Sequence, residues 1–198
     1  METAFDRSRL VALLRRDALR TGQFTLASGR TSHYYVDGRK VTLSAEGAAE
    51  VAAGVLDVLS GRPEVEAVGG LTLGADPIVG ATLALAGLRG VPLKGFLVRK
   101  EAKGHGTGQL VEGPVQPGQT VAILDDVATT GGSSLKAVDA VLAMGGKVAC
   151  VIVMLDRLEG AAKAFEARGL DFYALATIRD LDVEPLHPEV TELPHIDG

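Results

Sequence analysis

The segment Val121-Ala-Ile-Leu-Asp-Asp-Val-Ala-Thr-Thr-Gly-Gly-Ser-Ser134 decides how the chain is interpreted. Its first four residues are apolar and predict a buried strand that ends at two carboxylates, Asp125 and Asp126. A turn rich in Thr, Gly and Ser follows, and Leu135 opens a helical pattern. A strand that is apolar along its whole length is covered on both faces, which is typical of a parallel sheet between helices.

Short apolar strands and helices alternate on both sides of this segment. This alternation predicts an α/β fold with a doubly wound, mainly parallel sheet and flanking helices. Ligands of such sheets bind beyond the carboxyl ends of the strands. The strands are predicted at 65–70, 93–98, 121–124, 147–155 and 172–176, and the helices at 44–59, 77–88, 133–144 and 159–168.

The first 43 residues follow a different pattern. A helix is predicted over 5–19, and an extended stretch over 24–37 has a turn at its centre, at 28–30. We expect residues 1–43 to form an N-terminal helix and a small hood. Residues 44–198 then form the core with a C-terminal extension.

Composition excludes several classes of protein. With 46% apolar residues among 198, the chain can bury a substantial core and is not mainly disordered. Twenty Lys and Arg against 25 Asp and Glu leave a net charge of −5, so no nucleic-acid partner is expected. The single cysteine, Cys150, excludes an intrachain disulfide, and the longest apolar run, 148–155, is far shorter than the ~20 residues that cross a bilayer. The expected location is the cytoplasm, without membrane contact.

The turn after the acidic pair has the chemistry of a phosphate site. Glycines allow close backbone wrapping, so several N–H groups can point into one concavity at the start of a helix, where the dipole favours an anion. Asp125 and Asp126 can accept hydrogen bonds from a sugar diol or hold a hydrated Mg²⁺. The segment therefore suits a sugar phosphate, although an ordinary strand–helix turn with a capping serine remains an alternative. No GxxxxGK[ST] motif of nucleotide-binding loops is present.

A second segment, Leu97-Val-Arg-Lys-Glu-Ala-Lys-Gly-His-Gly-Thr-Gly-Gln-Leu-Val-Glu-Gly113, is rich in glycine and basic residues. Its cationic side chains are Arg99, Lys100, Lys103 and His105. Such a loop suits a mobile arm that closes over a polyanion such as diphosphate. The alternative is a solvated surface loop.

Both segments resemble a known family. VAILDDVATTGGSS resembles the phosphoribosyl pyrophosphate (PRPP) signature of type I phosphoribosyltransferases, and RKEAKxHGxG resembles the catalytic loop of orotate phosphoribosyltransferases. The stretches 24–37 and 155–160 (LDRLEG) are similar to further segments of that family. The resemblance implies the type I phosphoribosyltransferase fold and Mg²⁺-dependent transfer of a phosphoribosyl group from PRPP to orotate, in pyrimidine biosynthesis. It also implies a homodimer with shared active sites.

The resemblance also implies roles for individual residues. The catalytic set is Lys103, His105, Asp125 and Asp126, in which Lys103 or His105 either donates a proton to the leaving diphosphate or acts through its charge alone. Orotate is expected to contact Thr129, Arg157, Tyr34 and Tyr35. Mg²⁺ is expected to arrive with PRPP, without a direct protein ligand other than Asp125 or Asp126. PRPP is expected to contact Arg99, Lys100, Lys103, His105, Asp125, Asp126, Val127, Ala128, Thr129, Thr130, Gly131, Gly132 and Ser133.

The chain departs from the family pattern at two places. Ala27 stands where many members have lysine, and the short loop 70–77 carries no lysine. Arg30 is one candidate to replace a missing contact. Two other functions stay open at this point: a purine-type phosphoribosyltransferase, and a PRPP-sensing regulator without catalysis.

Overall fold

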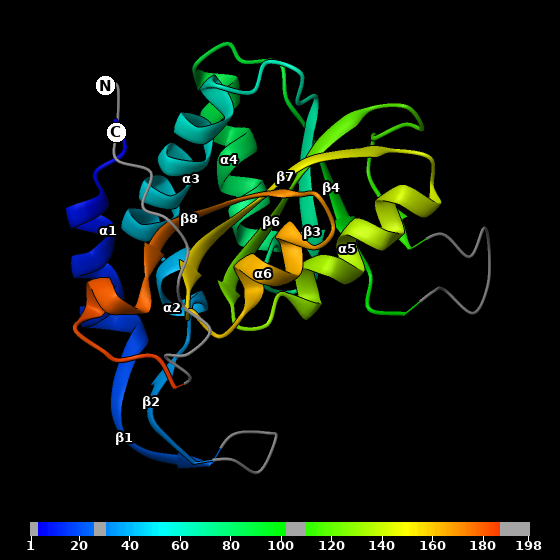
Figure 1. The fold of residues 1–198 in the computed structure, drawn as a ribbon. Helices are drawn as coiled ribbons and strands as arrows, with labels where there is room; N and C mark the ends of the chain where they lie inside the picture. Colours follow the sequence, from blue (N-terminus) through cyan, green and yellow to red (C-terminus); the bar gives the residue numbers. More distant parts are fainter. Residues whose placement is uncertain (1–3, 26–30, 102–109, 187–198) are drawn as a thin grey trace.

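A computed structural model describes residues 4–25, 31–101 and 110–186. Its centre is a six-stranded sheet in the order β5-β4-β3-β6-β7-β8 (Figure 1). Five of these strands run parallel, and β5 pairs antiparallel with β4. The predicted doubly wound sheet is therefore confirmed. The strands are β3 (Ala67–Leu71), β4 (Lys94–Val98), β5 (Val111–Glu112), β6 (Thr120–Ala128), β7 (Lys147–Asp156) and β8 (Asp171–Thr177).

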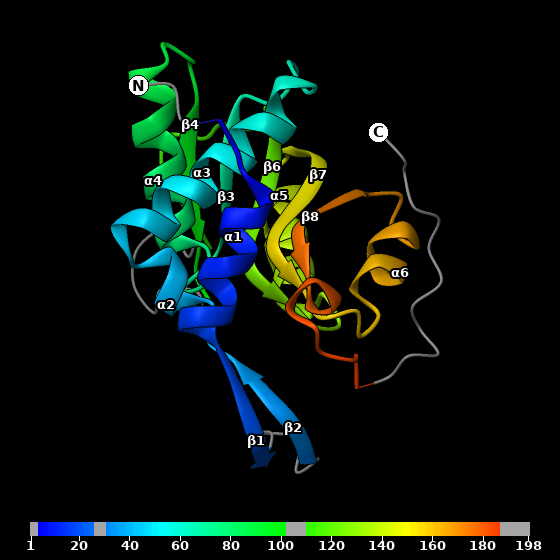
Figure 2. The ribbon, with the colours of Figure 1, turned by 90° about the vertical axis from the view of Figure 1, so that its left-hand side faces the viewer.

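Helices cover both faces of the sheet. Figures 1 and 2 show α1, α3 and α4 on one face and α5 and α6 on the other. Within the described ranges, no helix is long and apolar enough to cross a membrane. The helices are α1 (Arg7–Leu13), continued by the π-helical turn η1 (Leu14–Ala18), then α2 (Arg39–Thr42), α3 (Ala45–Ser60), α4 (Asp76–Leu88), α5 (Gly132–Ala143), α6 (Ala161–Glu166) and the 3₁₀ turn η2 (Ile178–Leu181).

Two apolar clusters fill the space between the sheet and its helices. In β6, Ala122 and Leu124 belong to the cluster that also holds residues of α1, α3 and α4. Val121 and Ile123 belong to the opposite cluster, with residues of α5 and α6. Successive side chains of a strand point to opposite faces, so a strand covered on both faces must be apolar at every position. This explains the unbroken apolar runs in the sequence.

The N-terminal segment forms a separate two-stranded sheet. Strands β1 (Leu19–Thr25) and β2 (Thr31–Val36) pair antiparallel, and the hairpin projects from the body of the domain (Figure 2). Extended structure begins at residue 19 rather than 24, because Leu19 pairs with Val36 at the base of the hairpin. The predicted turn at 28–30 lies outside the described residues. The domain boundary after residue 43 stays a prediction.

Strand β6 is longer than the sequence pattern predicted. We expected it to end at residue 124, but it continues through the acidic pair to Ala128. The reason is its neighbour β7, whose Leu155 and Asp156 pair with the last residues of β6. Asp125 and Asp126 therefore belong to the strand, and the backbone around them is held by the ladder.

The fold predicts a sharp contrast between two glycines. A Cβ atom added at Gly70 in β3 would lie 2.0 Å from the Leu124 carbonyl oxygen, whereas nothing lies within 4 Å of one added at Gly80 in α4. We expect Gly70→Ala to lower the free energy of unfolding by at least ~2 kcal/mol, because neighbouring backbone must move. Gly80→Ala, the matched control, is expected to raise it by ~0.5–1 kcal/mol through helix propensity. Urea unfolding followed by circular dichroism measures both, and equal stability of the two variants would contradict this packing.

Candidate active site

Asp125 and Asp126 lie side by side near the end of β6, and Asp125 is only 5% exposed. The Ser134 hydroxyl donates a 2.9 Å hydrogen bond to Asp125 Oδ2, and the amide of Asp126 donates one of 3.0 Å to Asp125 Oδ1. Burial, followed by the neighbouring carboxylate, raises the pKa of Asp125 to about 7. Burial also raises the pKa of Asp126. The fold thus holds two acids where their charge is costly, which is typical of functional sites.

Two glycines from different segments lie close to the acidic pair. A Cβ atom at Gly38 would lie 3.0 Å from Asp126 Oδ2, and one at Gly74 would lie 2.7 Å from Asp126 Oδ1 and 2.8 Å from Asp125 Oδ1. A side chain at either position would displace a carboxylate. The backbones before α2 and before α4 therefore form walls around the acidic pair.

The acidic pair opens into a cavity of about 220 Å³. The cavity brings together the end of β6, the start of α5, the segment between β3 and α4, the end of β4 and the start of α2. It is lined by Arg39, Leu71, Thr72, Leu73, Gly74, Lys100, Asp125, Asp126, Val127 and Ser133. Of the described members of the PRPP-binding set predicted from the sequence, five line it, namely Lys100, Asp125, Asp126, Val127 and Ser133.

The turn after β6 leads directly into α5. Gly131 has a φ of 79°, a conformation that favours glycine, and a Cβ atom there would lie 2.9 Å from Phe165 Cζ. The Thr129 carbonyl accepts a 3.1 Å hydrogen bond from the amide of Ala161, which ties the turn to α6. The turn, which contains Thr130 between Ala128 at the end of β6 and Gly132 at the start of α5, is thus held against α6 at the N-terminus of a twelve-residue helix. Helix N-termini favour anions, and the binding of an anion at this turn stays a prediction.

The basic loop is described only at its two ends. Lys100 lines the cavity, whereas the Arg99 guanidinium lies 3.7 Å from Glu112 Oε1 in an exposed ion pair. Lys103 and His105 lie outside the described residues. Their catalytic roles and their proton donation stay predictions.

Arg157 follows β7 and lies beside the end of β6, where its amide donates a 2.9 Å hydrogen bond to the Ala128 carbonyl. Its side chain is 10% exposed and its Nη2 lies 2.7 Å from Oε1 of Glu159, which is 5% exposed. Its Nε donates a 3.3 Å hydrogen bond to the Tyr34 hydroxyl, and its guanidinium lies 4.9 Å from the centre of the Tyr34 ring. A buried guanidinium is thereby neutralised by Glu159 and positioned by Tyr34.

The two tyrosines predicted to contact orotate have different surroundings. Tyr34 is fully buried, and burial raises the pKa of its hydroxyl. Tyr35 is 40% exposed, and its ring centre lies 5.9 Å from that of Phe24. Because side chains alternate along β2, Tyr34 packs behind Arg157, whereas Tyr35 offers an open aromatic surface.

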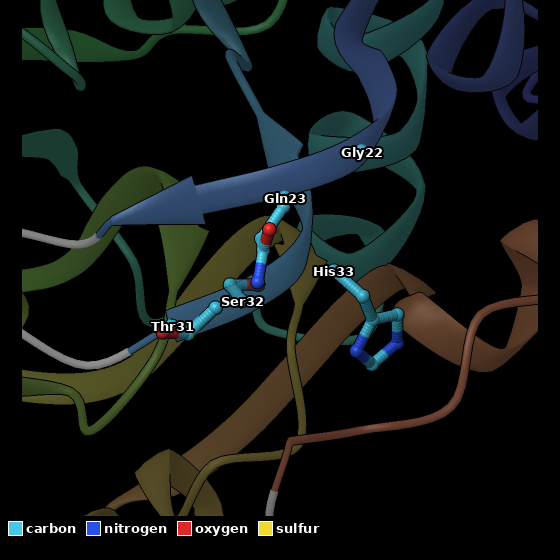
Figure 3. A pocket seen from close by; sticks show the side chains of 5 residues that line it. All are labelled: Gly22, Gln23, Thr31, Ser32 and His33. Atoms are coloured by element: carbon cyan, nitrogen blue, oxygen red, sulfur yellow. The ribbon is translucent and has the colours of Figure 1, made fainter.

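A second hollow, of about 390 Å³, lies on the hairpin and is lined by Gly22, Gln23, Thr31, Ser32 and His33. Figure 3 shows the Gln23 side chain reaching from β1 toward Ser32, while the His33 ring points away from it. Among the described residues, this lining holds no carboxylate and no arginine or lysine. The acidic cavity is therefore the better candidate for a phosphorylated ligand.

Sequence reasoning missed several residues of this site. Gly38 and Arg39 directly follow the stretch 24–37 but carry no motif of their own, and α2 is too short to show periodicity. Glu159 lies inside the LDRLEG stretch, in which the sequence pattern singles out only the arginine. Arg30, the candidate replacement for a missing basic contact, lies outside the described residues, whereas Arg39 lines the cavity.

Comparisons with known proteins agree with this geometry. No protein-family model matches the chain. The orotate phosphoribosyltransferase of Rhodopirellula baltica is 51% identical over 185 residues, which are 91% of this chain and 96% of that protein. The chain belongs to the orotate phosphoribosyltransferase family.

Solved structures of the family share the fold. Orotate phosphoribosyltransferase of Mycobacterium tuberculosis in complex with Fe(III) dicitrate has a TM-score of 0.78 and 41% identity, covering 89% of this chain and 99% of that one. The same enzyme in complex with PRPP has a TM-score of 0.75 and 38% identity, with the same coverage. The predicted family and the type I phosphoribosyltransferase fold are confirmed, and the protein is a glycosyltransferase enzyme.

The buried acid predicts a specific dependence of stability on pH. Because the pKa of Asp125 rises from 3.8 to about 7, the folded protein binds more protons than the unfolded chain between these values, and stability falls as pH rises through them. We expect Asp125→Asn to unfold with a free energy about 2 kcal/mol above that of the natural protein at pH 8, with a smaller difference at pH 5.

Urea titrations at the two pH values measure this difference. Asp57→Asn on the exposed face of α3 is the matched control for the loss of one aspartate charge. A gain for Asp125→Asn that is equal at both pH values would contradict a raised pKa.

Proposed function

We propose that the protein transfers the phosphoribosyl group of PRPP to orotate, giving orotidine 5′-monophosphate and diphosphate, as its relatives' name indicates. The observation that carries the proposal is the cavity in which Asp125, Asp126, Lys100 and Ser133 meet. Family membership disfavours the alternatives of a purine-type enzyme and of a non-catalytic regulator.

The ribose hydroxyls and the 5′-phosphate of PRPP would bind to two different groups of the site. The Asp125 and Asp126 carboxylates accept hydrogen bonds from the ribose hydroxyls. The amides of the turn from Val127 to Ser133, with the hydroxyls of Thr129 and Thr130, hold the 5′-phosphate at the start of α5. Anchoring both ends of the sugar phosphate orients its anomeric carbon, where the bond to diphosphate breaks.

The chemical step builds negative charge on the departing diphosphate. Fixed cations aimed at that group lower the barrier, because they stabilise charge that is greatest in the transition state. Lys100 and Arg99 at the end of β4, with Lys103 and His105 of the same loop, supply this charge in the proposal. Lys103 or His105 also donates the proton that the diphosphate accepts.

Mg²⁺ fits the donors of this cavity. Asp125 and Asp126 offer hard oxygen ligands, but two carboxylates are fewer than the ion requires, and Mg²⁺ is commonly shared with substrate phosphates. We therefore assign the remaining ligands to PRPP and to water. When bound, the ion neutralises charge on the diphosphate oxygens.

The base is assigned to the other side of the site. Arg157 can pair with the carboxylate of orotate, since a guanidinium presents parallel N–H donors to such a group. Glu159 already neutralises Arg157, so orotate has to share or displace that ion pair. Tyr35 offers an aromatic face for the ring, Tyr34 positions Arg157 from behind, and Thr129 borders the base and the sugar.

The protein would act in the cytoplasm as a homodimer.

The reaction is tested by the absorbance change of orotate when protein, Mg²⁺ and PRPP are mixed. We expect turnover with orotate and none with hypoxanthine, guanine, adenine or uracil. Asp125→Asn combined with Asp126→Asn is expected to abolish turnover, because the ribose loses both acceptors, while the far-ultraviolet circular dichroism stays unchanged. Turnover with a purine, or full activity of the double variant, would contradict the proposal.

The shared-site homodimer is tested by complementation. Lys103→Ala alone is expected to lower turnover by at least ~10²-fold, through loss of a charge that acts in the transition state. Mixing this variant with the inactive double variant of Asp125 and Asp126 is expected to restore activity, because hybrid dimers contain one site with both the intact loop and the intact acids. Each variant mixed with itself is the control, and absence of recovery would indicate a self-contained subunit.

A further inference from the structure

Arg39 is a cation of the acidic cavity that the sequence motifs did not assign. It opens α2 directly after Gly38, whose missing Cβ lets the backbone pass against Asp126 Oδ2. Arg39 therefore enters the same cavity as the acidic pair and Lys100. Its neighbour Lys40 does not line this cavity and instead lies within electrostatic reach of Asp17.

The Arg39 guanidinium is anchored at one edge. Its Nε donates a 3.0 Å hydrogen bond to Asp37 Oδ1, and the side chain is half exposed. Within the described part of the chain, its two terminal nitrogens make no hydrogen bond. A guanidinium fixed through Nε still presents planar donors, which match the spacing of phosphate oxygens.

The cavity has few positive charges with which to bind a diphosphate. The described cationic side chains that line it are Arg39 and Lys100, beside two carboxylates. The facing loop, 70–77, carries no lysine, and its Leu73 is largely exposed. The loop 70–77 by itself therefore offers no positive charge to a diphosphate group.

We propose that Arg39 is a catalytic residue that binds the diphosphate of PRPP and stabilises its charge as it leaves. This inference rests on the proposed function and adds a residue to it. In the proposed function, backbone amides at the start of α5 bind the 5′-phosphate. Arg39 is therefore available to bind the diphosphate. The terminal N–H groups of Arg39 would contact two diphosphate oxygens and compensate for the missing lysine of the 70–77 loop.

Calorimetry separates this role from a general disturbance of the site. The probes are inorganic diphosphate with Mg²⁺, and orotidine 5′-monophosphate, which lacks the diphosphate. We expect Arg39→Gln to weaken diphosphate binding at least tenfold, to leave nucleotide binding within about twofold, and to lower kcat by about 10²-fold. Arg39→Lys is expected to recover part of kcat, because it keeps the charge but loses the planar pair of donors.

Lys40→Gln is the matched control, since it removes one positive charge from the neighbouring position of the same helix. It is expected to behave like the natural protein with both probes. The inference is overturned if Arg39→Gln matches Lys40→Gln, or if it loses affinity for both probes equally. Activity of the natural protein with orotate is measured first: its absence refutes the proposed function, whereas normal activity with an unaffected Arg39→Gln refutes only the role of Arg39.

Discussion

The burial of two adjacent carboxylates at the end of β6 is the constraint on which the site depends. Asp125 is nearly inaccessible to water, and its ionised form is disfavoured by that burial and by Asp126. Within the described residues, its hydrogen-bond donors are the Ser134 hydroxyl and the Asp126 amide. Such an arrangement costs folding free energy, and it becomes favourable when a ligand brings hydroxyl donors or a cation.

The surrounding elements are arranged to keep that pair in place. Pairing with β7 prevents the end of β6 from fraying, and glycine backbones from two separate segments close on the carboxylates. Gly38 and Gly74 serve the same physical purpose although they lie far apart in the chain. Each lets a backbone approach where any side chain would push an acid out of position.

The second charged cluster, Arg157 with Glu159, differs from the acidic pair because its two charges compensate each other. Arg157 is buried but already paired with Glu159 and covered by Tyr34, so its charge is compensated before any ligand arrives. The acidic pair therefore favours an incoming cation or hydroxyl, whereas in the proposed function Arg157 would exchange the Glu159 carboxylate for that of orotate. The two clusters lie at the ends of neighbouring strands, so the proposed sugar site and the proposed base site are adjacent.

Local sequence accounts for the fold class, the alternation of strands and helices and the place of the acidic pair. Those features depend on apolar periodicity and on motifs whose residues are contiguous. The length of β6 could not be predicted in this way, because polar residues at its end continue as strand only through pairing with β7. The short helix α2 was missed for a similar reason, since four residues show no period.

The chain by itself determined that a turn suited to an anion follows two acids on a buried strand, because those groups are neighbours along the backbone. Only the tertiary structure decided that Arg39 joins them, that Glu159 neutralises Arg157 and that Tyr34 is buried while Tyr35 is open. These relations link residues from different elements. They follow from how a strand alternates its faces and from how closely two backbones can approach, neither of which a local pattern contains.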